Sequence, residues 1–350
     1  KMRIAIITDQ HFGARKGSAL FHDYFLKFYN DIFFPTLEKE GITTIVDMGD
    51  TFDNRRGIDF LALDWAKENY FNRLRDMNIK VHTIVGNHTA YYKNTNEVNT
   101  IQLLLNEYKN IICYEKATEI KLDKLKVLIV PWINKENREE TVDCIKKSKA
   151  KVVMGHLELN GFHANKYVVM DHGDDCAIYN KFDQVFSGHY HTRSSRDNIH
   201  YLGNPYEIYW NDVDDPRGFN LYDTDTQELT QIDNPHKMFH HVYYNDTPHQ
   251  LVDTSKYKDK IIKIIVKQKS NLSDFEKFIE KFVNSNVHDI KVVENFDFNG
   301  YYNPEEIESD ESEDTISILN RYIDESDVSL NKSQIKNLLK EVYIEACEVE

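Results

Sequence analysis

The 350-residue sequence has no long apolar stretch and few cysteines. No run of about 18 apolar residues occurs, so no membrane-spanning helix is predicted. The N-terminus lacks the pattern of a signal peptide, because residues 3–8 are already typical of a buried strand. The four cysteines have none of the paired spacings of a zinc knuckle or a disulfide framework. These absences favour a reduced, cytoplasmic protein.

An excess of basic residues is also absent. The net charge is −15, which at first argues against a polyanionic partner. The charge is uneven, however, because residues 303–350 contain 14 acidic and 4 basic side chains and so carry −10. The other 302 residues carry −5, and two bound divalent cations would bring them close to neutral. Charge therefore leaves a nucleic-acid partner open without supporting one.

The N-terminal two thirds of the chain alternate between apolar strands and amphipathic helices. Strands are predicted at 3–8, 43–48 and 81–85, with helices over 20–32 and 60–77 between them, which indicates an α/β core. Pro35 should kink or break the first helix, and Gly41 should end it. Later segments predict a helix over 98–108, a hairpin around residues 123–124 and four further strands, at 151–154, 183–187, 199–202 and 218–222.

The pattern of predicted strands and helices changes near residue 238. Residues 1–237 form the first predicted domain, and residues 238–298 a small α+β domain with strands at 261–266 and 290–293 and a helix over 274–283. Residues 299–314 are a predicted linker, with seven acidic and no basic residues between Glu305 and Asp314. Residues 315–350 predict two short helices. The apolar stripe of the second consists of Ile335, Leu338, Leu339, Val342, Tyr343 and Ala346.

The stretch Gly49-Asp50-Thr51-Phe52-Asp53 carries the first chemical signal. It follows a buried strand, so two carboxylates lie at the strand's carboxyl end, where ligands bind in α/β sheets. Neighbouring carboxylates require a cation or a proton to offset their repulsion.

Four similar motifs follow other predicted strands. They are Asp9-x-His11, Gly86-Asn87-His88, Gly155-His156 and Gly188-His189-x-His191. Each motif alone could instead be an ordinary surface loop or, for His189-x-His191, alternate residues on one strand. The chain has 15 histidines, so some coincidence is expected. Five motifs at five strand ends are poorly explained by coincidence. Imidazole, amide and carboxylate donors without thiolates suit ions such as manganese rather than a structural zinc. So many donors fit two ions bridged by a carboxylate, as in the hydrolysis of phosphate esters.

These motifs resemble those of the calcineurin-like metallophosphoesterase superfamily. Within it the chain is similar to the SbcD-type DNA-repair nucleases, including the recombination endonuclease subunits of T-even-like bacteriophages. The strings that carry this narrower resemblance are Thr83-Ile84-Val85-Gly86-Asn87-His88, Gly155-His156-x-Glu158-Leu159-Asn160-Gly161-Phe162, Ser187-Gly188-His189-Tyr190-His191-Thr192 and Asp215-Pro216-Arg217-Gly218-Phe219. The resemblance implies a β-sandwich flanked by helices, a small capping domain that controls DNA access, and C-terminal helices that bind a partner.

The resemblance also implies a ligand set. One ion would be held by Asp9, His11, Asp50 and His191, and the other by Asp50, Asn87, His156 and His189, with Asp50 bridging. Manganese is the expected metal, with magnesium as the alternative.

Two further residues receive catalytic roles from the resemblance. His88 would act on the phosphate, either as the general acid for the leaving oxygen or as a cation that stabilises the transition state. Asp53 is expected to hydrogen-bond His88 rather than to bind metal. The family usually has an acid after this histidine, and this chain has Thr89, which puts metal affinity or His88 orientation in doubt.

Candidate substrate contacts lie on the predicted rim of the site. Ordinary solvated loop charges are the alternative for each of Arg55, Arg56, Tyr92, Lys93 and Arg193.

The expected partners are DNA and an SMC-like coiled-coil ATPase, bound by residues 315–350, in a heterotetramer that contains a homodimer of this chain. The alternative is that those helices fold back on the chain's own body. The predicted function is metal-dependent cleavage of DNA in recombination and double-strand-break repair, in the cytoplasm of an infected bacterium if a phage encodes the chain. The alternatives are a phosphatase or cyclic-nucleotide phosphodiesterase with the same metals, and a DNA-end-binding scaffold with weak nuclease activity.

Overall fold

The computed structural model describes residues 2–166, 168–294, 323 and 331–347. The predicted acidic linker, and all but one residue of the first predicted C-terminal helix, lie outside them. The chain divides into two compact units, the first comprising Lys1–Tyr206 with Asp215–His236 and the second Glu207–Asp214 with Lys237–Glu350. In the described part, no helix combines the length and apolar character needed to cross a membrane.

The first unit contains two six-stranded sheets. In the first sheet the order is β14-β13-β1-β2-β3-β4. Its strands, in chain order, are β1 (Arg3–Ile7), β2 (Thr44–Asp47), β3 (Lys80–Ile84), β4 (Ile111–Tyr114), β13 (Gly218–Asp223) and β14 (Leu229–Asp233). Strands β1 to β4 run parallel, whereas β13 and β14 are antiparallel additions at one edge. The carboxyl ends of β1, β2 and β3 therefore lie at one edge of this sheet.

The second sheet has the order β11-β12-β10-β7-β6-β5. Its strands are β5 (Thr118–Leu122), β6 (Leu125–Val130), β7 (Val152–His156), β10 (Gln184–Gly188), β11 (Ser194–Arg196) and β12 (Ile199–Tyr201). Strands β6, β7, β10 and β12 are parallel, and β5 closes the predicted hairpin with a turn at Asp123, whose φ is 56°. A short hairpin of β8 (His163–Asn165) and β9 (Val168–Val169) lies outside both sheets.

The two sheets pack face to face. One core cluster contains side chains from both, among them Ile4, Ile6 and Val46 from the first sheet and Val127, Met154 and Phe186 from the second. Buried apolar faces of two sheets that share one core define a sandwich. The predicted fold class, a β-sandwich flanked by helices, is confirmed.

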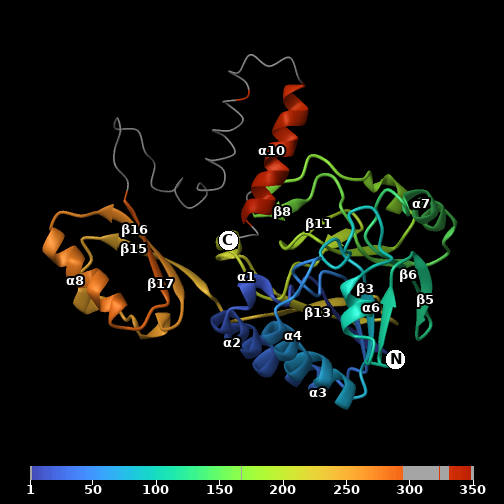
Figure 1. Cartoon of the computed structure of the whole chain (residues 1–350), viewed down its shortest axis with the longest axis horizontal. Coiled ribbons are helices and arrows are strands. Elements are labelled where there is room, and N and C mark those ends of the chain that lie inside the picture. The colour runs from blue at the N-terminus through green and yellow to red at the C-terminus, as the bar shows by residue number, and fades with distance from the viewer. Residues whose placement is uncertain (1, 167, 295–322, 324–330, 348–350) are drawn as a thin grey trace. The chain divides into compact units, whose positions relative to one another are not determined.

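Helices cover the outer faces of the sandwich (Figure 1). On the first sheet lie two long helical segments, α2 (Ala19–Phe28), the π-helical turn η1 (Tyr29–Phe33) and α3 (Phe34–Lys39), then α4 (Phe60–Ala66), η2 (Lys67–Phe71) and α5 (Asn72–Asp76). Pro35 lies in α3 directly after the π-helical turn η1, where the regular helical hydrogen bonding is already interrupted, and the helical segment continues through it. Gly41 follows with a φ of 61°, as its predicted role requires.

Aromatic side chains fill the space between these helices and the first sheet. Phe28, Tyr29 and Phe33 are fully buried, and Phe28 and Phe33 contact Phe219 of β13 edge to face. Such contacts add about 0.5–1.5 kcal/mol per pair beyond area burial. The aromatic residues of the first predicted helix are therefore core.

Several elements were not predicted, because their sequences are polar or short. Helix α7 (Arg138–Lys147), on the second sheet, buries only Thr141 and Ile145. Edge strand β14 is half exposed, and so has no clear apolar alternation. Helix α6 (Thr100–Leu104) is shorter than predicted. The smallest elements are α1 (Ala14–Gly17), η3 (Cys176–Tyr179), η4 (Trp210–Asp212), η5 (His249–Leu251) and η6 (Ser255–Tyr257).

The second unit is built on three parallel strands. They are β15 (Phe239–Asn245), β16 (Ile261–Gln268) and β17 (Asp289–Glu294). Helix α8 (Leu272–Val283) packs Phe275, Phe278 and Phe282 against one face of this sheet. Strand β15 was missed because histidine and tyrosine interrupt its apolar pattern. Near the C-terminus, α10 (Lys332–Cys347) is helical as predicted, and Leu338 and Val342 on it are exposed.

Candidate metal centre

The predicted ligands follow the strands whose carboxyl ends meet at one edge of the sandwich. Loops after β1, β2 and β3 carry Asp9, Asp50 and Asn87, and the second sheet contributes the end of β7 and the loop after β10. Within the described ranges there are three groups in which the possible ligand atoms lie within 4.8 Å of one another, and two of the groups share His11. The groups are Asp9, His11 and His191; Asp50, His156 and His189; and His11, Asp53 and His88.

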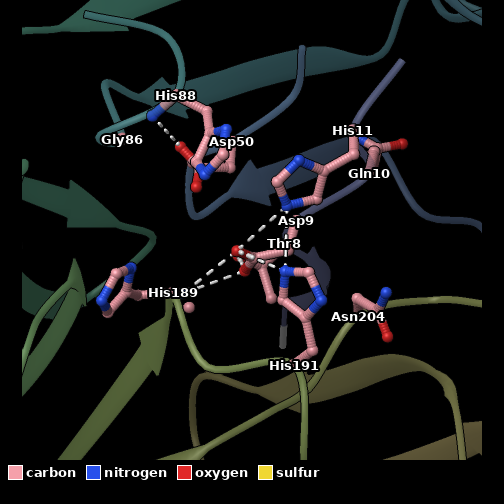
Figure 2. A network of polar contacts seen from close by, with 12 residues as sticks. Thr8, Asp9, Gln10, His11, Asp50, Gly86, His88, His189, His191 and Asn204 are labelled. Atoms are coloured by element: carbon pink, nitrogen blue, oxygen red, sulfur yellow. Dashed lines mark hydrogen bonds and ion pairs between the residues drawn. The ribbon is translucent and has the colours of Figure 1, made fainter. Parts of the chain in front are cut away.

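The first group joins the two sheets at Asp9 (Figure 2). The Nε2 atoms of His11 and His191 are 3.0 Å apart, and each lies 3.8 Å from the same Asp9 oxygen. The backbone N–H of His189 also donates to the Asp9 carboxylate, at 3.0 and 3.2 Å. Two imidazole nitrogens this close need a proton or a cation between them, so the donor set fits a divalent ion.

The second group surrounds Asn87. Its side-chain oxygen lies 2.9 Å from His156 Nε2 and 3.1 Å from His189 Nδ1. His156 donates from Nδ1 to the Met48 carbonyl oxygen at 2.8 Å, which directs Nε2 into the site. A histidine whose other nitrogen bonds a carbonyl is in the tautomer that a metal ligand requires.

Asp50 belongs to the group of His156 and His189 and also contacts the loops of His88 and His11. One carboxylate oxygen accepts the backbone N–H of His88 at 2.9 Å, and the other lies 3.2 Å from His156 Nε2. The main-chain oxygen of Asp50 accepts the N–H of His11 at 2.9 Å. Asp50 therefore contacts three of the other motif loops.

The contact between Asp53 and His88 differs from the prediction. His88 Nδ1 bonds the main-chain oxygen of Asp53 at 2.6 Å, and the Asp53 carboxylate lies 3.0 Å from His11 Nδ1 instead. The expected hydrogen bond between the two residues is present, but it is made by the main-chain oxygen of Asp53, and the carboxylate lies beside His11. The sequence did not reveal this because a carboxylate three residues after Asp50 can reach either ring.

The backbone at the site is strained. Asp9, His11, Asp50 and His189 have φ angles of 53°, 48°, 50° and 86°, in the left-handed region that non-glycine residues rarely adopt. Such conformations cost on the order of 1–3 kcal/mol each and tend to cluster at functional sites. Four of the seven predicted ligands share this property.

Two glycines allow the close approach of the ligands. A Cβ on Gly86 would lie 2.1 Å from Asp50 Oδ1, and a Cβ on Gly188 would lie 2.6 Å from Asp9 Oδ2. Any side chain there would displace a predicted ligand, which explains why glycine precedes Asn87 and His189.

The electrostatics of the centre favour an ionised Asp50 carboxylate beside protonated His156 and His11. Burial alone would raise the pKa of Asp50, but His156 and His88 more than offset it and hold that pKa well below its ordinary value. Burial alone would lower the pKa of His156, yet Asp50 raises it to about 9, and Asp53 and Asp9 raise the pKa of His11 in the same way. Without an ion, protons on these histidines therefore balance the carboxylates, and a divalent cation must displace them.

A buried polar network that the sequence did not reveal supports two of the loops. Gln10, between two predicted ligands, bonds Asp47 at 3.1 Å and accepts from Tyr29 at 2.7 Å. Thr51 donates to the same Asp47 oxygen at 2.7 Å. Burial raises the pKa of Asp47 to about 7. Asp47 thus ties the loop after β1 to the loop after β2.

The loop after β10 has its own support. Fully buried Arg217 donates to the main-chain oxygen of His191 and to the Asp215 carboxylate, which also accepts from Thr192 at 2.9 Å. The Asp-Pro-Arg-Gly-Phe string supported the family resemblance but had no assigned role. In the structure, its Asp215 and Arg217 hold the loop that carries His191.

Three more residues near the ligands were not assigned to the site or remained in doubt. Glu158 Oε1 lies 3.8 Å from His189 Nε2, on the side of the ring opposite Asn87. Thr89, which stands where the family usually has an acid, is buried, and its hydroxyl bonds both the N–H and the carbonyl oxygen of Gly86. Trp132, after β6, places its ring 5.1 Å from that of His189.

The predicted substrate contacts are less concentrated. Tyr92 and Lys93 are exposed in the loop that follows His88, and Arg56 is exposed in the loop after Asp53, where Arg55 is half-buried. Arg193 pairs with Asp233 at 2.5 Å and lines a cavity of about 410 Å³ with residues of β11, β12 and β14. The structure therefore surrounds Arg193 with a different set of residues from the ligand groups.

Comparisons with known proteins agree with this geometry. The family model of the calcineurin-like phosphoesterases matches residues 2–193. Exonuclease subunit 1 of Enterobacteria phage T4 is 34% identical over 281 residues, which cover 79% of this chain and 78% of that protein.

Among solved structures, an archaeal phosphodiesterase has a TM-score of 0.35 at 13% identity, over 67% of this chain and 100% of that one. A dimetal phosphatase from Danio rerio has a TM-score of 0.38 at 11% identity, over 63% and 91%. Both structural similarities are weak and support no conclusion about function.

Proposed function

The chain belongs to the calcineurin-like phosphoesterase family, and on that premise we propose that it is a DNA nuclease subunit that uses two divalent ions. The observation that carries this proposal is the position of Asp50: its carboxylate lies with His156 and His189 and accepts the N–H of His88, and its main-chain oxygen accepts the N–H of His11. A carboxylate within reach of donors from both sheets is what a bridged pair of ions needs. The phage relative, named as an exonuclease subunit, favours DNA over small phosphate esters.

The donor set divides between the ions as follows. We assign Asp9, His11 and His191 to one ion and Asn87, His156 and His189 to the other, with Asp50 shared. When bound, such ions supply a nucleophilic hydroxide and neutralise charge on the phosphoryl oxygens. The absence of thiolates and the mixture of carboxylate, amide and imidazole donors favour manganese or magnesium.

His88 is assigned the proton chemistry. Its Nδ1 faces the Asp53 carbonyl oxygen, which can only accept, so Nδ1 carries a hydrogen. Nε2 is then the nitrogen that would act on the substrate; when the ring carries a second proton, Nε2 can deliver it to the leaving oxygen, and the ring is left neutral with its hydrogen on Nδ1. The backbone N–H of His88 donates to Asp50 at 2.9 Å, which holds the residue beside the carboxylate assigned to both ions.

The Asp53 carboxylate has a different role in this scheme. It contacts His11 Nδ1 at 3.0 Å and so directs Nε2 of that ring toward Asp9 and His191. A carboxylate behind a metal-binding histidine fixes its tautomer and raises its basicity. Asp53 thus supports catalysis through a ligand.

The remaining parts concern partners. We propose that residues 238–298 form a domain that controls access of DNA, and that residues 315–350 bind an SMC-like ATPase in an assembly that contains a homodimer of this chain, in the cytoplasm of an infected bacterium. Exposed Leu338 and Val342 on α10 support this proposal, because an apolar stripe on a short helix is stabilised by a partner.

Cleavage assays with the His88→Ala variant test the proposed chemistry. Purified protein with Mn²⁺ is offered single-stranded DNA, double-stranded DNA and a small phosphomonoester. Wild type should cleave DNA, and the variant should retain metal binding while its rate falls about 10²- to 10⁴-fold. Cleavage of the monoester alone would support a phosphatase, DNA binding without cleavage would support a scaffold, and wild-type rates in the variant would remove His88 from the mechanism.

A further inference from the structure

Trp132 lies at the same edge of the sandwich as the predicted ligands. It follows β6 by two residues, and β6 pairs in parallel with β7, the strand that ends at His156. The carboxyl end of β6 therefore points in the same direction as the carboxyl ends of β7 and β10. No motif marked this position, because a single tryptophan after a strand is most often core.

The main chain of Trp132 is fixed on both sides. Its N–H donates to the Val85 carbonyl oxygen at 2.9 Å, directly before the Gly86-Asn87-His88 turn. Its carbonyl oxygen accepts from Asn96 and Asn137, both at 2.9 Å. The indole thus projects from a rigid anchor that joins the second sheet to the His88 loop.

The indole ring adjoins the second ion's predicted ligands. Its centroid is 5.1 Å from that of His189 and 6.2 Å from that of His156. The side chain is nevertheless partly exposed, and its ring nitrogen has no hydrogen-bond partner among the residues that the structure describes. The residue is thus accessible in part beside these predicted ligands.

We propose that Trp132 forms a nucleobase subsite, in which the base of a nucleotide next to the scissile phosphate stacks on the indole. This inference rests on the proposed function, because it takes the substrate to be a nucleic acid. An aromatic face stacks on any base, so the subsite favours nucleic acid over small phosphate esters without selecting a sequence. The indole N–H can donate to a sugar or phosphate oxygen of the same nucleotide.

The partly exposed indole is also a spectroscopic reporter. The chain has three tryptophans, and direct stacking of a base should quench the fluorescence of Trp132. In EDTA, where cleavage cannot occur, a thymidine oligonucleotide should quench the wild-type protein, whereas an abasic oligonucleotide of the same length should not. Trp132→Phe should lose the quench, and Trp210→Phe, in the other unit, should retain it.

Kinetics separate stacking from a structural role. With Mn²⁺, Trp132→Ala should raise KM for the thymidine oligonucleotide about ten-fold or more, and its KM for the abasic oligonucleotide should change by less than about two-fold. Trp132→Phe should recover part of the loss. Mn²⁺ affinity, measured by calorimetry, should not change in either variant.

The outcomes separate the two proposals. Equal losses on both oligonucleotides, or no loss on either, would overturn the subsite. If wild type cleaved neither oligonucleotide, the proposed function would fail, and the fluorescence experiment would still decide the subsite: base-dependent quenching that Trp132→Phe removes would support it, and quenching by the abasic chain or none at all would overturn it.

Discussion

The two sheets of the sandwich bring different chemistry to the metal centre. The loops of the first sheet carry both carboxylates assigned as ligands, Asp9 and Asp50, together with His11, Asn87 and His88. The ligands assigned on the second sheet are all imidazoles, from His156, His189 and His191, and the indole of Trp132 and the Glu158 carboxylate lie beside His189. Among the assigned ligands, the carboxylates are thus on one sheet only, whereas imidazoles come from both sheets. The difference teaches that neither sheet can hold the proposed ions alone.

Contacts across this division are already present without ions. Asp50 lies 3.2 Å from His156, and Asp9 accepts the backbone N–H of His189. Protons on the histidines allow these contacts, since Asp50 raises the pKa of His156 to about 9. Metal ions would replace protons in joining the two sheets.

The largest effect is expected from removing the charge of Asp50, the carboxylate assigned to both ions. Asp50→Asn keeps the shape of the side chain but removes the charge that both ions share. A lost supporting residue costs about 10–100-fold in metal affinity, so the loss of a bridging ligand should exceed about 100-fold and abolish cleavage. Calorimetry with Mn²⁺ measures this. Asp53→Asn is the matched control, which should lose at most about 100-fold; equal affinity of Asp50→Asn and wild type would refute the bridge.

Changing the pH tests whether protons and metals compete. Because its pKa rises from 6.5 to about 9, protonated His156 stabilises the metal-free fold fully below pH 6.5, and this contribution disappears as the pH rises through about 9. His11 acts in the same direction. The Tm of the metal-free protein should therefore fall over this window, and the increase in Tm on adding Mn²⁺ should grow. An increase in Tm that shrinks with rising pH would contradict the competition; His88→Ala should behave as wild type does.

A smaller effect sharpens the view of the second sheet. Glu158→Gln removes the carboxylate behind His189, 3.8 Å from its Nε2. A carboxylate beside Nε2 favours the hydrogen on that nitrogen and leaves Nδ1 of His189 free to bind an ion. Without it, Mn²⁺ affinity should fall about ten-fold. Glu139→Gln, on the solvent side of α7, serves as the control. Unchanged affinity in Glu158→Gln would mean that the second sheet orients its histidines without a carboxylate.

The smallest effect concerns Thr89 on the first sheet. Its hydroxyl satisfies the Gly86 N–H at 2.8 Å, which Thr89→Val would leave without a partner. The free energy of unfolding should fall by about 1 kcal/mol, measured by urea denaturation. Mn²⁺ affinity should change by less than about three-fold. A large loss of affinity would instead make Thr89 part of the metal site, in the place of the usual acid.

The sequence predicted the elements that bear strong local patterns. The strands before Asp9, Asp50 and Asn87 are apolar runs followed by glycine or acid, and all are present. Polar edge strand β14 and helix α7 were missed because their stability comes from tertiary pairing rather than from their own pattern. A helix predicted to kink or break at Pro35 continues as a helical segment, with the proline directly after the π-helical turn η1.

For the site, the sequence indicated which residues gather but not how they pair. Motif order identified the ligand groups, because strand ends at one sheet edge converge. Asp53 hydrogen-bonds His88 as expected, but through its main-chain oxygen, since loop conformation places its carboxylate beside His11. Trp132 lies in no motif, and Glu158 lies in the string that begins at Gly155 but received no role; the parallel order of β6, β7 and β10 places both beside His189.

The most direct test of the central claim counts the ions and their coupling. Electron paramagnetic resonance of the Mn²⁺-loaded protein should show two ions per chain with the exchange-coupled spectrum of a bridged pair. Asp50→Asn should lose that coupling. A wild-type spectrum of a single, uncoupled ion at saturating Mn²⁺ would contradict the shared carboxylate and the joining of the two sheets through it.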